Sequence, residues 1–219
     1  MRACARSIGG VLILSMTHGL VCGASAWTIR AGENLFPTKK GSSWTFSGTA
    51  GSQKLKMTAE ITSSTTSGGS STVIMLWTQN GRSVQEETYT VSQGQVVRVK
   101  AGAGGAMQSS PPVPVIKYPM AVGKSWSWKG AELVGSMRIP ASAQLKVAAK
   151  EAVKTAAGTF NAYRVDMKVT TSVQGQNVTA TNSYWFAAGV GMVKQSAIVN
   201  IPGGKPLVVT AALEKYEIK

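Results

Sequence analysis

The stretch TNSYWFAAGVGMVKQSAIVN, residues 181–200, indicates the fold of the whole chain. Two arms rich in aromatic and β-branched residues flank a run of alanines and glycines, which predicts an antiparallel β-hairpin. Because glycine adopts a positive φ at little steric cost, Gly189 or Gly191 is expected at the tip or at a bulge beside it. No motif in this hairpin indicates reactive chemistry, so the hairpin predicts structure alone.

Residues 1–26 are predicted to be a secretion signal. Arg2 and Arg6 supply the positive region, and the apolar run at residues 8–16 is too short to span a bilayer. Ala24-Ser25-Ala26 supplies the small-x-small cleavage motif, so cleavage is expected before Trp27. This signal predicts an exported protein, periplasmic or extracellular.

Lipidation of Cys22 is the alternative to cleavage before Trp27. A lipobox needs a leucine three residues before the cysteine and a small residue directly before it, and Gly19-Leu20-Val21 offers neither. No later stretch is long and apolar enough for a membrane helix. Residues 27–219 are therefore expected to form one antiparallel β domain.

Cleavage would remove Cys4, Cys22 and His18, which are all the cysteines and the one histidine of the chain. A mature chain without thiols and imidazoles excludes thiolate catalysis, Ser-His-Asp catalysis and zinc held by Cys or His. No catalytic residue, metal or cofactor is expected, since acid–base work usually recruits histidine. A hydrolase using Asp and Glu alone is the remaining enzymatic alternative.

The chain is strongly basic, with 23 Lys and Arg against 9 Asp and Glu and a net charge of +14. Outside the cytoplasm this surplus points to phospholipid head groups, lipopolysaccharide or acidic wall polymers, and nucleic acid is not an expected partner. The simpler interpretation is a solvated outer face that keeps the protein in solution.

Alternating apolar and polar residues predict strands along most of the chain, most clearly at residues 53–62. Asn80-Gly81 is the strongest short hairpin signal. We predict an all-β fold, in which about a dozen antiparallel strands in two meanders form a single curved sheet, a barrel or half-barrel.

Two segments are harder to assign. Residues 101–114 are rich in Gly, Ala and Pro, and they are expected to form a long central loop. Residues 141–157 combine helical spacing of apolar residues and many alanines with an equally good strand alternation. The surrounding β pattern favours a strand there, against the local helix propensity.

Three motifs in order resemble a group of secreted bacterial β domains of unknown function. The motifs are Tyr118-Pro119 with Gly123, Ser125 and Trp126; Ala157-Gly158-Thr159-Phe160; and Tyr184-Trp185-Phe186-Ala187 with Gly189 to Lys194. Ala188 departs from the pattern, where proline is expected. More loosely, the group is similar to the lipoprotein-carrier superfamily, whose curled sheet encloses an apolar cavity. The resemblance implies an extracytoplasmic location and a ligand cavity, and it implies no catalytic residues.

The leading hypothesis is a non-enzymatic β domain that binds an apolar or amphiphilic, lipid-like ligand within the curled sheet. The predicted ligand-binding residues are those expected to face inward: Leu55, Met57, Val97, Val99, Val165, Met167 and Met192. The alternative is a structural envelope protein that holds anionic polymers on a basic outer face. The residues predicted for that face are Lys54, Lys56, Arg98, Lys100, Lys146, Lys150, Arg164 and Lys168.

Overall fold

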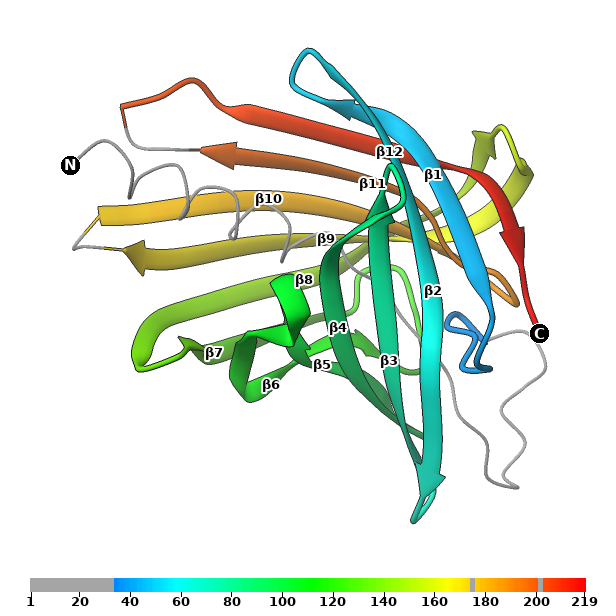
Figure 1. Ribbon diagram of the computed structural model, residues 1–219, viewed down its shortest axis with the longest axis horizontal. Helices are drawn as coiled ribbons and strands as arrows, with labels where there is room; N and C mark the ends of the chain where they lie inside the picture. Colours follow the sequence, from blue (N-terminus) through cyan, green and yellow to red (C-terminus); the bar gives the residue numbers. More distant parts are fainter. Residues whose placement is uncertain (1–33, 174–175, 201–202) are drawn as a thin grey trace.

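A computed structural model describes residues 34–173, 176–200 and 203–219, and within these ranges the chain is all-β (Figure 1). Twelve antiparallel strands follow one another around a closed barrel. Strand β1 (Ser43–Ala50) pairs with β12 (Leu207–Glu217) and completes the circuit. The predicted fold class is therefore confirmed, in its closed form.

The remaining strands alternate in direction, and short connections join most of them. They are β2 (Gln53–Ser67), β3 (Ser70–Gln79), β4 (Arg82–Ser92), β5 (Gln95–Ala101), β6 (Met107–Lys117), β7 (Ser125–Val134), β8 (Met137–Thr155), β9 (Gly158–Val173), β10 (Gln176–Ala187) and β11 (Gly191–Asn200). Figure 1 shows β2–β4 crossing the direction of β9–β12, so the two sides of the barrel face each other across the interior, here called the lumen.

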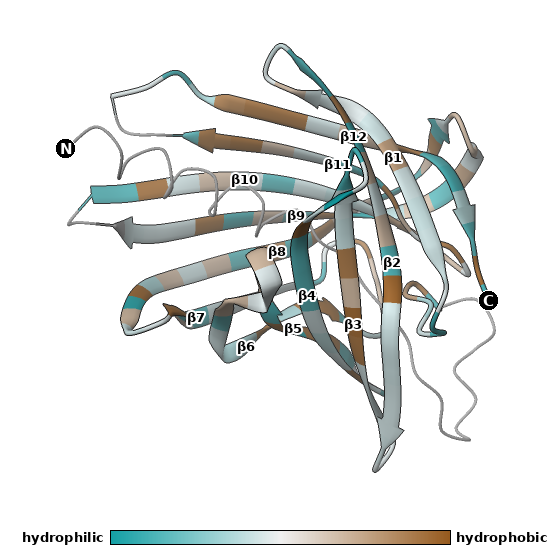
Figure 2. Cartoon of the chain, viewed as in Figure 1, coloured by the Kyte–Doolittle hydropathy of each residue, from teal (hydrophilic) through white to brown (hydrophobic). Residues whose placement is uncertain are grey.

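Hydrophobic and hydrophilic residues alternate along several strands in Figure 2, because successive side chains point to opposite faces of a sheet. One end of the lumen is filled with large side chains. Trp44, Phe46 and Trp77 are buried there, and the Phe46 and Trp77 rings stack at 5.8 Å. A space of only about 10 Å³ remains beside them, next to Met75 and Met192, so this end is a packed core.

The hairpin at residues 181–200 forms as predicted, with β10 and β11 as its arms. Gly189 and Gly191 have φ values of 74° and 93°, and a bulge interrupts the pairing between Trp185 and Phe186. The hairpin also anchors the start of the described chain. Gly189 N donates to Asn34 O at 2.6 Å, and Trp44 Nε1 donates to Val190 O at 2.6 Å. The hairpin therefore helps to close one end of the lumen.

Residues 141–157 lie mostly within β8, which confirms the interpretation as a strand. Strands β7 and β9 supply backbone partners along both edges of β8. These hydrogen bonds, together with burial of Ala141, Ala143 and Leu145 on one face, outweigh the helix propensity of alanine.

The prediction of a long loop at residues 101–114 is wrong for most of that range. A turn of 3₁₀ helix, η1 (Ala103–Gly105), joins β5 to β6, and β6 already begins at Met107. The two predicted meanders are therefore one continuous series of strands. Prolines at positions 111, 112 and 114 made this strand hard to predict. Proline cannot donate a backbone hydrogen bond to a β-ladder, and within sheets it is typical of edge strands.

The β6–β7 seam is unusual, because only residues 107–110 of β6 pair with β7. Two indoles span the remainder. Trp126 Nε1 donates to Pro114 O at 2.7 Å, and Trp128 Nε1 donates to Pro111 O at 2.9 Å. Tryptophan side chains thus satisfy carbonyl groups that the proline-rich strand cannot pair through a regular ladder.

The predicted signal, residues 1–26, lies outside the described residues. In the part of the chain that the structure describes, no helix has the length and apolar character needed to cross a membrane.

A substitution at Gly48 tests how closely β1 and β12 approach each other where they close the barrel. A Cβ added at Gly48 would lie 1.8 Å from the carbonyl oxygen of Thr210. We expect Gly48→Ala to lower the free energy of unfolding by about 1–3 kcal/mol or more, as other overpacked substitutions do. Urea denaturation measures this change. The control is Gly94→Ala, because nothing lies within 4 Å of an added Cβ there. Equal urea midpoints of unfolding for the two variants would contradict a close contact between β1 and β12.

Candidate ligand site in the barrel lumen

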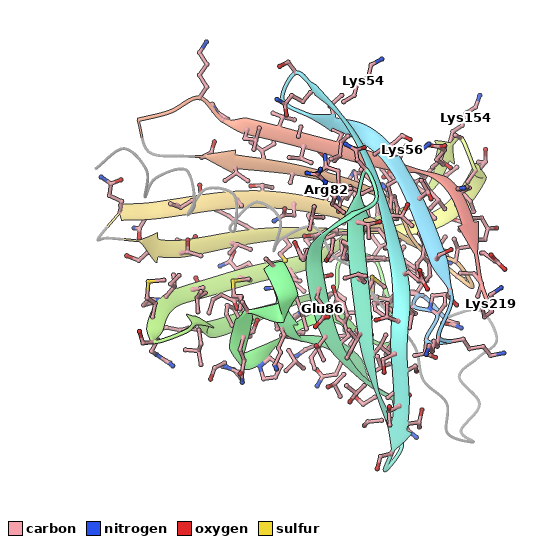
Figure 3. The ribbon with its side chains drawn as sticks, viewed as in Figure 1. Lys54, Lys56, Arg82, Glu86, Lys154 and Lys219 are labelled. Carbon is pink, nitrogen blue, oxygen red and sulfur yellow. The ribbon has the colours of Figure 1, made fainter. Side chains whose placement is uncertain are left out.

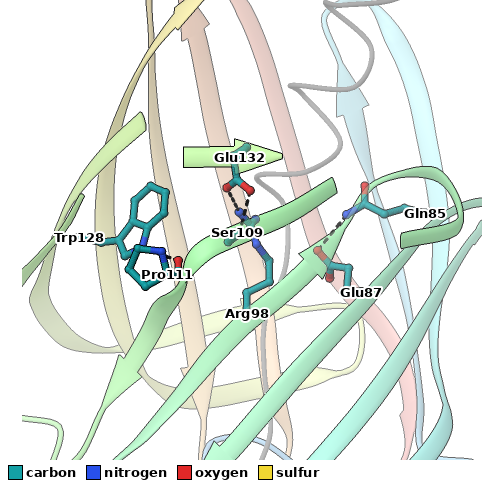
Figure 4. Close-up of polar contacts among 7 residues, drawn as sticks. All are labelled: Gln85, Glu87, Arg98, Ser109, Pro111, Trp128 and Glu132. Atoms are coloured by element: carbon teal, nitrogen blue, oxygen red, sulfur yellow. Dashed lines mark hydrogen bonds and ion pairs between the residues drawn. The ribbon is translucent and has the colours of Figure 1, made fainter. Parts of the chain in front are cut away.

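Buried polar and charged side chains lie on the inner face of β4–β7. This set of residues is here called the polar wall. The wall consists of Gln85, Glu87, Arg98, Ser109 and Glu132. Arg98 Nη2 lies 2.9 Å from Glu132 Oε1, and Ser109 Oγ donates to Glu132 Oε2 at 2.8 Å (Figure 4). The two charged side chains are only 8% and 11% exposed, so their mutual pairing offsets the cost of desolvation.

Glu87 is the second buried carboxylate of the polar wall. Gln85 Nε2 donates to Glu87 Oε1 at 2.9 Å. Tyr89 OH and Trp77 Nε1 both donate to Glu87 Oε2, at 2.8 and 3.1 Å. Three donors around one carboxylate hold it in a single orientation, as an anion buried in the lumen needs.

The electrostatics of the lumen shift the pKa values of Arg98, Tyr89 and Tyr184. Burial alone would lower the pKa of Arg98, but the carboxylates of Glu132 and Glu87 raise that pKa above its usual value. Burial, and then Glu87, raises the pKa of Tyr89. Burial also raises the pKa of Tyr184, with Arg98 acting against this rise and Glu87 adding to it. Both phenols therefore remain hydrogen-bond donors, and Tyr184 on β10 lies within electrostatic reach of the polar wall.

Part of the opposite side of the lumen is lined by short side chains, here called the small-residue wall. This wall consists of Ala143, Val169, Ala180, Ala197, Val199 and Val209, contributed by β8–β12. All six are buried and lie on the same face as their neighbours in the register. Short side chains reach less far into a barrel than the aromatic residues at its other end.

Gln195 is the unusual residue on this side of the lumen. It is 1% exposed, and among the described residues neither Oε1 nor Nε2 of its amide has a hydrogen-bond partner. Gln195 lies opposite Tyr184 in the β10–β11 register, and buried Asn182 lies opposite Ala197 one step further along. An unpaired buried amide costs about 1–3 kcal/mol and calls for an explanation. We name Gln195, Asn182 and Tyr184 the amide patch.

The predicted ligand-binding residues are only partly brought together. Val165 and Met167 face the lumen opposite Tyr184 and Asn182 in the register, whereas Met57 and Met192 are buried towards the packed aromatic end. Leu55 is half-buried against the core.

Val97 and Val99 were expected to face inward, and this orientation is wrong. Both are half-buried, whereas Val96 and Arg98 are buried inside. A shift of one residue turns every side chain of a strand to the other face, and register shifts flank β5 on both sides.

The predicted basic face is largely exposed. Lys54, Lys56, Lys100, Lys146, Lys150 and Lys168 lie on the surface, and Figure 3 shows Lys54 and Lys56 extending outward. Arg164 is half-buried and pairs with Glu151 and Asp166. Arg98 does not belong to this face, since it is 7% exposed inside the lumen.

The sequence analysis missed the polar wall and the amide patch. One signal was present, because Gln85, Glu87 and Tyr89 occur at alternate positions of a strand, which places all three on one face. No local sequence pattern indicated that Arg98 pairs with Glu132, because 34 positions separate the two residues. Within the described ranges, no cluster of three His, Cys, Asp or Glu side chains is arranged to hold a metal ion.

The fold and its lumen define the class of protein, a closed twelve-stranded antiparallel β-barrel. Residues 135–198 match the family model described as DUF3108-like, and this stretch contains the second and third motifs of the predicted resemblance. Over that stretch the chain is similar to a family of bacterial β domains of unknown function. No curated protein matches the chain.

Two solved structures share the fold at low sequence identity. A candidate lipoprotein from Parabacteroides distasonis is 14% identical with a TM-score of 0.57, and the match covers 84% of this chain and 98% of that one. A candidate exported protein with a YmcC-like fold from Bacteroides fragilis is 14% identical with a TM-score of 0.56, covering 83% and 98%. These similarities establish the architecture and leave the function open.

The Arg98–Glu132 pair should be essential for stability. We expect Glu132→Ala to cost about 3–5 kcal/mol of unfolding free energy, because it removes the carboxylate that pairs with the buried Arg98 charge. The matched control is Glu214→Ala, which removes the exposed pair with Lys56 (2.7 Å) and should cost much less, because solvent screens an exposed ion pair. Chemical denaturation compares the two variants. Similar losses would show that the buried pair has no special role.

Proposed function

We propose that this protein is an exported, non-enzymatic β-barrel domain that holds an amphiphilic ligand in its lumen. The polar end of the ligand would contact the amide patch, and its apolar part would lie along the small-residue wall. The polar wall lies on the other side of the lumen from the amide patch and the small-residue wall. It would confine the polar end of the ligand.

The unpartnered amide of Gln195 is the observation that carries this proposal. The amide can donate two hydrogen bonds and accept others, and it lies buried beside Asn182 and the protonated hydroxyl of Tyr184. A buried polar group without a partner destabilises the folded protein. A ligand carrying a carboxyl, hydroxyl or amide group would supply the missing partner, which gives a reason for glutamine at this position.

The apolar part of the ligand would be held by burial. Each Å² of apolar surface removed from water contributes about 25 cal/mol before the costs of binding are subtracted. The small-residue wall supplies such surface, and it lies away from the end of the lumen that Trp44, Phe46 and Trp77 already fill. Lipid-like molecules fit this division into one polar and one apolar part.

The chemistry of the lumen supports a binding role. Its two carboxylates are held by Arg98, Ser109, Gln85, Tyr89 and Trp77, an arrangement that stabilises fixed anions. The predicted secretion signal supports export, and so does the similarity of the fold to candidate lipoproteins and exported proteins.

A second candidate function is retention of anionic envelope polymers on the outer face. The exposure of Lys54, Lys56, Lys100, Lys146, Lys150 and Lys168 favours it. Binding through such a face should weaken as salt is raised, because exposed charges are screened over about 8–10 Å at physiological ionic strength. A ligand held in the lumen should depend much less on salt.

Titration with a dansyl-labelled fatty acid tests the lumen site. We expect the probe to bind the wild-type protein and Ala197→Trp to abolish binding, because the large indole would occupy the lumen. Ile198→Trp is the matched control, since Ile198 is 42% exposed on the opposite face of the same strand. Equal binding by both variants would overturn the proposal, as would a mass spectrum of the gently purified native protein without bound lipid together with no probe binding.

Gln195→Leu separates ligand binding from folding. This change removes the unpartnered amide, so the free energy of unfolding should stay equal or rise by about 1 kcal/mol. Loss of a buried hydrogen-bond partner should weaken probe binding about tenfold. A stable variant that binds the probe as tightly as wild type would exclude a role for Gln195 in holding the polar end.

A further inference from the structure

A groove of about 510 Å³ is lined by residues of β7–β10, and its exposed side chains lie on the outer face of the sheet. Trp126, Leu145 and Met167 are three of the ten residues that line it, and the other seven have polar side chains. They are Ser125 and Ser127 of β7, Gln144 and Lys146 of β8, Asp166 and Lys168 of β9, and Thr181 of β10. Six of the seven are exposed and Asp166 is half-buried, so the groove is open to solvent.

The register of the sheet arranges these side chains in two rows. Lys146 lies opposite Ser125 on one side and Asp166 on the other. Lys168 lies opposite Gln144 on one side and Thr181 on the other. Since neighbouring strands are about 4.8 Å apart, four strands give a polar strip about 14 Å wide, comparable to a short oligosaccharide.

The two lysines of the groove are free to bind an anion. Asp166 accepts a hydrogen bond from Ser183 Oγ at 2.7 Å and lies 3.3 Å from Arg164 Nε, so its charge is already engaged. Lys146, although opposite Asp166 in the register, forms no ion pair with any described residue, and neither does Lys168. Two unneutralised ammonium groups therefore lie within one groove.

We propose that this groove binds an acidic oligosaccharide, a sugar chain bearing carboxylate or phosphate groups. Lys146 and Lys168 bind the anionic groups, and Ser125, Ser127, Gln144 and Thr181 exchange hydrogen bonds with the sugar hydroxyls. A lone anion would use only the lysines, whereas the surrounding hydroxyl and amide groups match a polyhydroxylated chain. The site is independent of the lumen ligand, and it confines the second candidate function to one part of the basic face.

Binding of hexagalacturonate tests the groove, measured by calorimetry on the full mature chain. We expect the wild-type protein to bind hexagalacturonate and not neutral maltohexaose. Lys146→Gln with Lys168→Gln should weaken binding about tenfold or more, because losing one charge-assisted hydrogen bond already corresponds to about a factor of ten. Ser125→Ala with Ser127→Ala should weaken binding of hexagalacturonate while leaving any weak binding of inorganic phosphate unchanged.

The matched control removes the same charge elsewhere, through Lys54→Gln with Lys154→Gln. Both side chains extend into solvent in Figure 3, and neither residue lines the groove. Affinity for hexagalacturonate should be nearly unchanged in this variant. An equal loss in both lysine double variants would show general attraction by the basic surface and would overturn the groove as a site. Absence of any hexagalacturonate binding by the wild-type protein at low salt would overturn it too.

Discussion

Closure of the sheet is the constraint on which the rest of the structure depends. Pairing of β1 with β12 completes the circuit of strands, so inward side chains are surrounded by the wall of the barrel. The close approach of Gly48 to the Thr210 carbonyl shows how little space that pairing allows. Every polar group inside must therefore find a partner within the lumen or bind one from outside.

The lumen meets this requirement unevenly. At one end, Trp44, Phe46 and Trp77 fill the space. On the inner face of β4–β7, Glu87, Arg98 and Glu132 are held by hydrogen bonds and ion pairing. The side chains of the small-residue wall are short, and the Gln195 amide has no hydrogen-bond partner within the described part of the chain. A protein selected for stability alone would place an apolar residue there, so this contrast locates the proposed ligand. The outer groove differs in kind, because its free charges are hydrated and cost the fold little.

Features that depend on neighbouring residues in the sequence were predicted, whereas features that depend on distant residues were missed. The hairpin around Gly189 and Gly191 follows from glycine geometry, and β2 follows from strict alternation. Strand β6 was missed because its prolines resemble a loop until β5 and the indoles of Trp126 and Trp128 supply partners. On β5, valines and basic residues alternate in a way that suits either face. Arg98 is turned inward because Glu132, distant in sequence, pairs with it there.

The sequence by itself determined the β class, the hairpin positions and the basic charge, because each depends on neighbouring residues or on composition. Tertiary structure alone decided which face of β5 is inside, which carboxylates are buried, and which lysines meet in one groove. The physical reason is that a strand has two equivalent faces, and the partners across the closed barrel determine which of them is buried.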